Sequence, residues 1–110
     1  MQDSDIYSLF GNALDNALEA VVKLEDSEQR VIGVKVEKVR DMVTVHICNF
    51  YGEDIRFNPD TGLPETSKSN KDIHGYGMKS IRYIVDKYGG SLSVSASEGI
   101  FKLDILFPEI

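Results

Sequence analysis

The chain has a single cysteine, Cys48, so no disulfide can staple the fold of one copy. Its strand-like surroundings favour a small core or sheet residue over a redox or metal group. No apolar run approaches the roughly 20 residues that span a bilayer. The start, Met1, Gln2 and Asp3, lacks the basic and apolar regions of a signal peptide. A reduced, cytoplasmic setting is therefore expected.

Basic residues are in short supply as well. The 12 Lys and Arg are outnumbered by 18 Asp and Glu, and the formal net charge is −6. This balance disfavours loose binding to nucleic acid or to an anionic membrane surface. A small anionic ligand would need a local cation, helix N-termini or a few lysines. The 110 residues, 42% of them hydrophobic, predict one domain, residues 1–110, with its own core.

Residues 5 to about 24 predict an amphipathic helix that Asp3 or Ser4 can cap. One side of it carries two asparagines one turn apart, Asn12 and Asn16, although asparagine costs roughly half a kcal/mol relative to alanine inside a helix. Glu19 and Lys23 extend these two into a polar ridge. The predicted apolar stripe consists of Ile6, Leu9, Phe10, Ala13, Leu14, Ala17, Leu18 and Val21.

Alternating apolar and polar residues predict two hairpins, with turns at Arg40 and Asp41 and at Glu98 and Gly99. The apolar row of the first contains Ile32, Val34, Val36, Val43, Val45 and Ile47, and the period of two places Asn49 at its end. The row of the second contains Leu92, Val94, Ala96, Phe101, Leu103, Ile105 and Phe107.

Between the hairpins, a second helix is expected after residues 74–77, with Gly89 and Gly90 as its stop. Its predicted inner stripe is Met78, Ile81, Val85 and Tyr88. Hairpins with one buried face and two amphipathic helices predict an α+β fold, a two-layer α/β sandwich with a mainly antiparallel sheet covered on one face by helices.

Residues 52–73 have no sustained period and hold two of the three prolines. A long irregular segment in a small domain is usually functional, often a lid, and a loop without a role is the alternative. Lys68 and Lys71 in this segment could neutralise phosphate or could be exposed charges.

Three further features would converge with the lid if both helices lie on one face of the sheet. The amide oxygens of Asn12 and Asn16 suit Mg²⁺, although a solvated ridge is the simpler interpretation. Gly75 and Gly77 allow a ligand to approach the backbone at a helix N-terminus, or they form a tight turn. Asn49 can donate and accept a hydrogen bond, which is enough to recognise adenine, or it caps the following turn.

The order of these features resembles the GHKL nucleotide-binding superfamily (the Bergerat fold), which includes gyrase-type ATPases, the Hsp90 chaperone, MutL-type repair proteins and sensor histidine kinases. "NALDNALEA" resembles its N-box, and "HGYGMKSIRYIVDKYGG" resembles the G2 box and helix of a histidine kinase. "LDNALEA", a short lid with "TSK" and "HGYGMKSI" are together most similar to Agr-type quorum-sensing kinases. The similarity covers nearly the whole chain.

The resemblance implies roles for particular residues. Asn16 would coordinate the magnesium that bridges the ATP phosphates, with Asn12 near the same phosphates or the metal's waters, and both would take part in catalysis. Gly75 and Gly77 would shape the lid hinge and the phosphate-facing helix start. Asn49 falls where most relatives carry the aspartate that recognises adenine. The resemblance also implies ATP contacts from Glu19, Lys23, Lys68, His74, Tyr76 and Met78.

Two departures from the family pattern stand out. "NFYGED" replaces the usual Asp-x-Gly-x-Gly box, with Asn49 for the aspartate and Tyr51 for the first glycine. A neutral acceptor forms a weaker hydrogen bond than a carboxylate, although the Agr-type subgroup is similar in having asparagine here. The family usually has a further helix and strand before the N-box helix, so the chain is expected to be a catalytic domain truncated at its N-terminus.

The resemblance therefore implies an ATP-dependent protein-histidine kinase domain of a two-component system. It would bind Mg-ATP and donate the γ-phosphate to a histidine on a separate dimerisation domain, which then serves a response regulator. Neither His46 nor His74 suits the role of phosphoacceptor. The parent protein would be a membrane-bound sensor, and the isolated domain a monomer with little activity.

Three alternatives remain open at this point. The domain could be a degenerate GHKL module that acts in docking or regulation without catalysis. It could be a serine kinase of the anti-sigma-factor type. It could also be a plain α+β scaffold, which requires both boxes to be coincidence.

Overall fold

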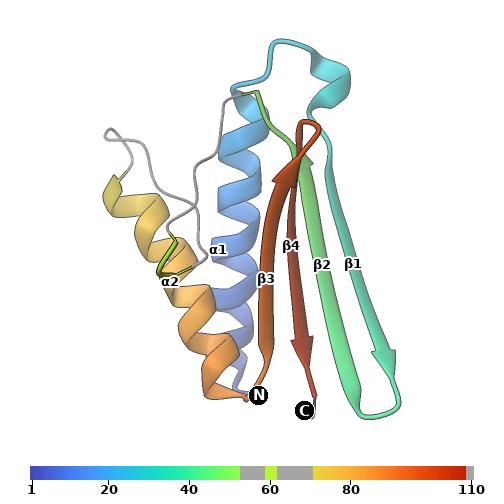
Figure 1. The fold of residues 1–110 in the computed structure, drawn as a ribbon, viewed down its shortest axis with the longest axis vertical. Helices are drawn as coiled ribbons and strands as arrows, with labels where there is room; N and C mark the ends of the chain where they lie inside the picture. The colour runs from blue at the N-terminus through green and yellow to red at the C-terminus, as the bar shows by residue number, and fades with distance from the viewer. Residues whose placement is uncertain (53–58, 62–70, 109–110) are drawn as a thin grey trace.

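The structure, a computed structural model, describes residues 1–52, 59–61 and 71–108, except for the side chains of residues 71–76. Figure 1 shows two helices on one side of a four-stranded antiparallel sheet with the order β1-β2-β4-β3. This arrangement confirms the predicted two-layer α+β sandwich. The elements are α1 (Asp3–Val22), a 3₁₀ turn (Ser27–Gln29), β1 (Ile32–Val39), β2 (Met42–Phe50), α2 (Lys71–Lys87), β3 (Ser91–Ser97) and β4 (Ile100–Phe107).

The core lies between the helices and the two central strands. Apolar residues of α1, α2, β2 and β4 form one cluster, and those of β3 pack against its edge. No described helix is long and apolar enough to cross a membrane. The buried residues of the cluster are Leu9, Ala13, Ala17, Val45, Ile47, Met78, Ile81, Ile84, Val85, Phe101, Leu103, Ile105 and Phe107.

Both predicted hairpins are confirmed. Arg40 and Glu98 adopt φ values of 58° and 54°, and Gly99 follows at 78°, so both turns use the left-handed backbone that tight hairpins require. In the first hairpin Ile32 lies opposite Asn49, which confirms Asn49 as the last residue of the apolar row.

The predicted apolar stripe of α1 is wider than the buried one. Leu9, Ala13 and Ala17 are buried, but Leu14 and Leu18 are 38% and 53% exposed, and Ile6 also reaches solvent. The capping prediction was wrong too. The helix begins at Asp3, with Gln2 as an N-cap that makes no side-chain bond. Asp3 lies in the first turn instead, where a negative charge is favourable.

The helix-side face of β1 is also less buried than its sequence predicts. Val34 and Val36 are 50% and 54% exposed, because β1 is an edge strand and α1 reaches only part of it. Cys48 lies in β2, as expected of a sheet residue, but it is exposed and not in the core. It faces away from the helices, opposite Gly33 of β1.

Helix α2 begins earlier than predicted. It starts at Lys71, so residues 74–77 lie inside the helix and not in a loop before it. The first four N–H groups of a helix are the ones without helical partners. Here they belong to residues 71–74, and Gly75 and Gly77 come after them. Glycine is tolerated inside a helix at a cost of about 1 kcal/mol, which explains how the helix can include this box. The predicted stop is confirmed, since α2 ends just before Gly89, whose φ is 69°.

A polar cluster joins the start of α1 to the end of α2. Asp5 accepts a hydrogen bond from the Tyr88 hydroxyl and pairs with Lys87 at 2.9 Å. The Gln2 backbone N–H donates to the same hydroxyl at 3.0 Å. The Tyr88 hydroxyl and the Lys87 ammonium hold the pKa of Asp5 below its usual value, and Asp5 raises the pKa of Lys87. The start of α1 and the end of α2 are thereby held together.

Candidate functional site

The asparagines of α1 lie on the flank of the helix that faces α2. Asn12 is half-buried, and its amide nitrogen donates to the Ser8 carbonyl at 2.8 Å and to the Ser8 hydroxyl at 3.2 Å. These bonds fix which way the amide points and reserve its oxygen for other partners. Sequence reasoning missed Ser8, although its spacing of four residues from Asn12 was a readable signal.

Gly77 of α2 lies directly against Asn12. A Cβ atom added to Gly77 would be 3.5 Å from the Asn12 amide oxygen and 3.9 Å from its Cβ. The structure thus brings the N-box-like helix and the G2-like glycine together, as the sequence predicted. Gly75 is two residues earlier in the same helix, about half a turn away. The side chains of His74 and Tyr76 lie outside the described residues.

The rest of the polar ridge continues along α1. Asn16 and Glu19 are half-buried, and Lys23 is an exposed residue at the helix C-cap. Asn16 and Glu19 each take part in a polar interaction with their surroundings. The ridge therefore offers two neutral amides, one carboxylate and one terminal ammonium in a row.

Asn49 lies at the end of β2, on the sheet face that the helices cover. It is 4% exposed and is the only polar side chain among the buried residues of the described ranges. Its amide nitrogen donates to the Phe50 carbonyl at 2.9 Å, which leaves the amide oxygen as its acceptor. A buried amide at the end of an apolar row suits a group that orients a ligand.

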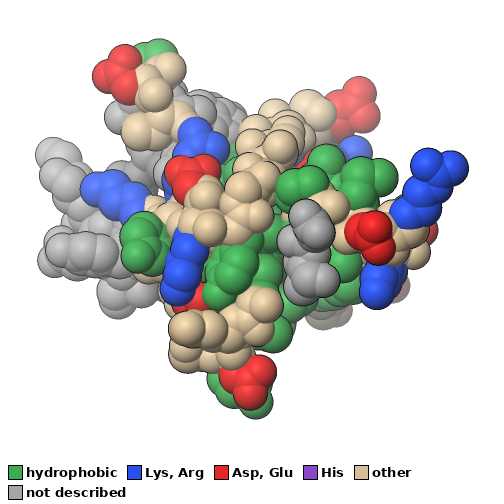
Figure 2. Space-filling model, turned by 90° about the horizontal axis from the view of Figure 1, so that it is seen from below, with side chains coloured by type: hydrophobic (Ala, Val, Ile, Leu, Met, Phe, Trp, Pro, Cys, Tyr) green, Lys and Arg blue, Asp and Glu red, His purple; other side chains and the backbone are tan. Residues whose placement is uncertain are grey.

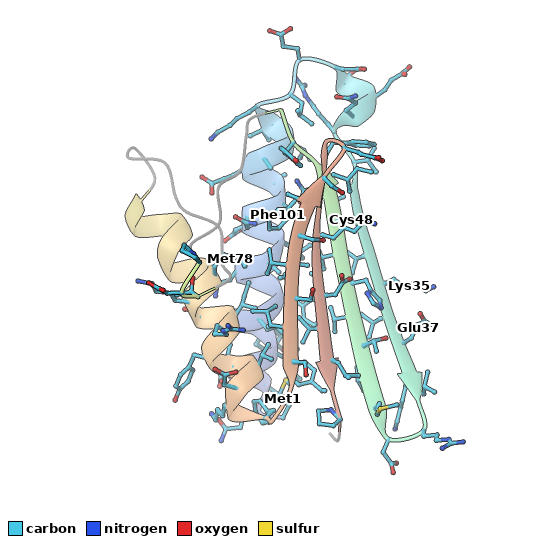
Figure 3. All side chains as sticks on the ribbon, in the orientation of Figure 1. Met1, Lys35, Glu37, Cys48, Met78 and Phe101 are labelled. Atoms are coloured by element: carbon cyan, nitrogen blue, oxygen red, sulfur yellow. The ribbon has the colours of Figure 1, made fainter. Side chains whose placement is uncertain are left out.

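Other predicted site residues lie in the core or outside the described residues. Met78 is 3% exposed and belongs to the hydrophobic core, on the side of α2 that faces the sheet (Figure 3). Lys68 lies outside the described residues, as does most of the predicted lid. Lys71 is the first residue of α2, and its side chain is likewise not described. Within the described part of the lid, the Thr61 carbonyl accepts a hydrogen bond from Arg82 of α2 at 2.9 Å.

The donor set of this site has a definite chemical character. Neutral amide oxygens are hard ligands, and Mg²⁺ typically keeps several waters and takes few protein ligands. Asn12 and Asn16 fit that pattern, because they are neutral amides spaced one turn apart on the same flank of α1. Among the described residues no cluster of three His, Cys, Asp or Glu side chains forms a closed metal site.

A second polar pair lies on the opposite, uncovered face of the sheet. His46 of β2 and Asp104 of β4 face each other across the strands, with Nδ1 and Oδ1 2.6 Å apart, and both are roughly half exposed. Sequence reasoning did not predict this pair, because it depends on the register between two strands far apart in the chain. It lies on the other face of the sheet from α1 and α2.

Comparison with known proteins agrees with this geometry. A family model described as a GHKL domain matches residues 1–108, almost the whole chain. A comparison with curated proteins found no match.

Proposed function

Because the chain belongs to the GHKL domain family, we propose that it is the ATP-binding catalytic domain of a sensor histidine kinase. GHKL domains are ATP-binding modules, and the family includes ATP-using kinases. The observation that carries the proposal is the contact between Asn12 and Gly77, which joins the N-box-like helix to the G2-like helix. The motifs "LDNALEA" and "HGYGMKSI" support an Agr-type, quorum-sensing member of this group.

In the proposed site, Asn16 and Asn12 hold Mg²⁺ and the ATP phosphates from the flank of α1. When bound, the metal supplies charge neutralisation at the phosphates and orients the γ-phosphate. The domain contributes positioning and no covalent chemistry of its own. Glu19, Lys23, Lys68, His74 and Tyr76 are proposed to line the nucleotide. Met78, which the resemblance also implicates, lies in the core and is proposed only to support the helix behind the site.

Asn49 is proposed to recognise adenine. Its amide nitrogen donates one hydrogen bond to the Phe50 carbonyl, which orients the side chain, and the amide oxygen would accept from the adenine amino group. The proposed partners are a histidine-bearing dimerisation domain, which receives the phosphoryl group, and a response regulator downstream. The domain would act on the cytoplasmic side of a membrane-bound sensor.

Calorimetric titration of ATP tests nucleotide binding. With magnesium present, we expect a single binding event that Asn16→Ala abolishes and Asn49→Ala weakens. Gln29→Ala, which removes an exposed neutral amide in the 3₁₀ turn outside α1, is the matched control and should bind as the parent does. If ATP at millimolar concentration gives no heat with or without magnesium, the proposal fails at its first step.

Phosphotransfer needs a separate test. The chain is incubated with labelled Mg-ATP and a dimerisation domain that carries a histidine, or with the same domain bearing serine in its place. An acid-labile phosphate on the histidine form alone supports a histidine kinase. Label on the serine form, or on neither while ATP still binds, would assign the domain to another branch of the family.

A further inference from the structure

Exposed apolar side chains gather on one flank of the molecule. Among the described residues, every large hydrophobic that is exposed lies on α1 or in residues 31–42, with Tyr83 as the one exception. Scattered exposed hydrophobics need no explanation, but a contiguous group marks an interaction surface. Hydrophobic side chains also reach the surface at the end of the sandwich that Figure 2 views. The members on the helix side are Ile6, Tyr7, Leu14, Leu18, Val22, Val34 and Val36; Val31 precedes β1, and Val39 and Met42 are paired on the opposite face of the sheet.

The apolar flank of α1 is separate from its ridge of asparagines. Leu14 and Leu18 follow Asn12 and Asn16 by two residues, which is about 200° around a helix. Asn12 faces Gly77 of α2, so the leucines lie on the side of α1 that turns away from α2. Within the sheet, α1 contacts β2 and the edge strand β1.

Strand β1 continues this apolar flank. Among the described residues it pairs with β2 alone, so the polar backbone groups along its other edge have no strand partner there. Val34 and Val36 lie opposite Ile47 and Val45, on the face that the helices cover, yet both valines are about half exposed. An unpaired strand beside uncovered valines is a surface that fits another strand.

We propose that a second copy of this chain occupies this surface, with β1 pairing antiparallel to the partner's β1 about a two-fold axis at Val36. The charges on β1 select this register. On its uncovered face Lys35 and Glu37 flank Val36, and their side chains lie 3.2 Å apart (Figure 3). A two-fold axis at Val36 places each Lys35 opposite the other copy's Glu37, so the pair is satisfied twice.

Neighbouring registers are less favourable. A two-fold axis at Lys35 sets the two lysines directly opposite each other, and an axis at Glu37 does the same for the glutamates; like charges directly opposite are destabilising. In the register at Val36, the two Val36 side chains meet on the helix-covered face. Lys38 falls opposite Val34, where its aliphatic stem can lie on the valine while its ammonium remains in water.

The two-fold arrangement joins both sheets into one and turns both apolar flanks of α1 toward the joint. A stable dimer buries about 1,600 Å² in total, so the interface requires the apolar flank of α1 in addition to the edge of β1. The asparagine ridge stays on the far flank of α1, so the dimer leaves the proposed nucleotide site open. This assembly differs from the monomer that the sequence alone led us to expect.

The test is the mass of the full chain in solution, measured by sedimentation equilibrium over a range of concentrations. We expect a monomer–dimer equilibrium that Lys35→Glu weakens roughly tenfold, because the reversed charge faces Glu37 twice in the interface. The double variant Lys35→Glu/Glu37→Lys restores both pairs and should regain the parent dissociation constant. Lys79→Glu, the same charge change at an exposed position of α2, should leave it unchanged.

Circular dichroism of each variant shows that the fold is retained. A chain that stays monomeric at every concentration overturns the proposal. So does a dimer that Lys35→Glu weakens no more than Lys79→Glu, because that dimer uses another surface. Failure of either kind leaves the nucleotide-site proposal untouched, since ATP titration reports on it separately.

Discussion

At the residue scale, the two asparagines of α1 illustrate how a locally unfavourable choice is accommodated. Asn12 occupies a helix position that disfavours it, and its amide nitrogen is satisfied by Ser8 one turn earlier. The polar ridge, the Asn49 position and both hairpin turns could be predicted from spacing alone. The Ser8 contact and the Asn49 amide orientation could not, because hydrogen-bond choice depends on atomic neighbours that spacing does not specify.

Asn49→Asp should destabilise the domain at neutral pH. The buried amide nitrogen donates to the Phe50 carbonyl, and a carboxylate in its place would set two oxygens against each other. We expect a loss of about 1–3 kcal/mol in the free energy of unfolding, measured with urea at pH 7. Near pH 3 the introduced carboxyl is protonated and can donate again, so the difference from the parent should shrink. Equal destabilisation at both pH values would contradict the hydrogen-bond assignment.

Replacing glycine with alanine is expected to have opposite effects on stability at two positions. At Gly90 an added Cβ would lie 2.6 Å from the Leu106 carbonyl oxygen and 3.1 Å from side-chain carbons of Phe107 and Val85. Gly90→Ala should therefore cost about 1–3 kcal/mol or more, because backbone and core must both shift. At Gly11, in α1, an added Cβ meets nothing within 4 Å. Gly11→Ala should stabilise by about 0.5–1 kcal/mol in the same urea titration, through helix propensity.

At the element scale, the strands followed their sequence pattern more closely than the helices did. Alternation with a period of two predicted which face of each strand is apolar. The register between β1 and β2 then placed Asn49 near the end of β2. Helix α1 has more apolar residues than the sheet can cover. Leu14 and Leu18 were therefore predicted to be buried but are exposed to solvent. Periodicity identifies an apolar flank but does not say whether the chain itself provides a cover for it.

The cluster that joins α1 to α2 predicts an acid-sensitive contribution to stability. Asp5 has a lowered pKa, because Tyr88 donates to it and Lys87 lies beside it. Its contribution is therefore complete above the unfolded value near 3.8 and is lost as pH falls through the lower folded value. Lys87 has a raised pKa, so its contribution is complete below 10.5 and is lost as pH rises through the higher folded value.

Asp5→Asn should lower the unfolding midpoint at pH 7 and have a progressively smaller effect as the pH falls below about 4. Tyr88→Phe removes the hydroxyl but keeps the ring, which packs edge-on against Phe107 at 6.4 Å between centroids. It is the control that separates the hydrogen bond from the packing. A midpoint shift for Asp5→Asn that does not change with pH would rule out the charged state of Asp5 as the cause.

At the scale of the whole molecule, one flank of α1 carries the proposed nucleotide site and the other carries the proposed dimer surface. This division follows from the 200° step between Asn12 and Leu14, and the sequence contains it. What the sequence could not reveal is that α2 covers the first flank and that no described element covers the second. The order of strands decides this, because β1 lies at the sheet edge next to α1.

Binding of Mg-ATP should stabilise the whole domain by mass action. At a free concentration of one hundred times the dissociation constant, a ligand that binds only the folded chain adds about 2.7 kcal/mol to the free energy of unfolding. Removing magnesium with a chelator, with ATP still present, should abolish most of this gain, since the amide oxygens of α1 offer no charge of their own to the phosphates. For Asn16→Ala, ATP with magnesium should raise the free energy of unfolding only slightly, as ATP without magnesium does for the parent chain. If the parent is stabilised equally with and without magnesium, the phosphates are held by cationic side chains and not by a metal on the asparagine ridge.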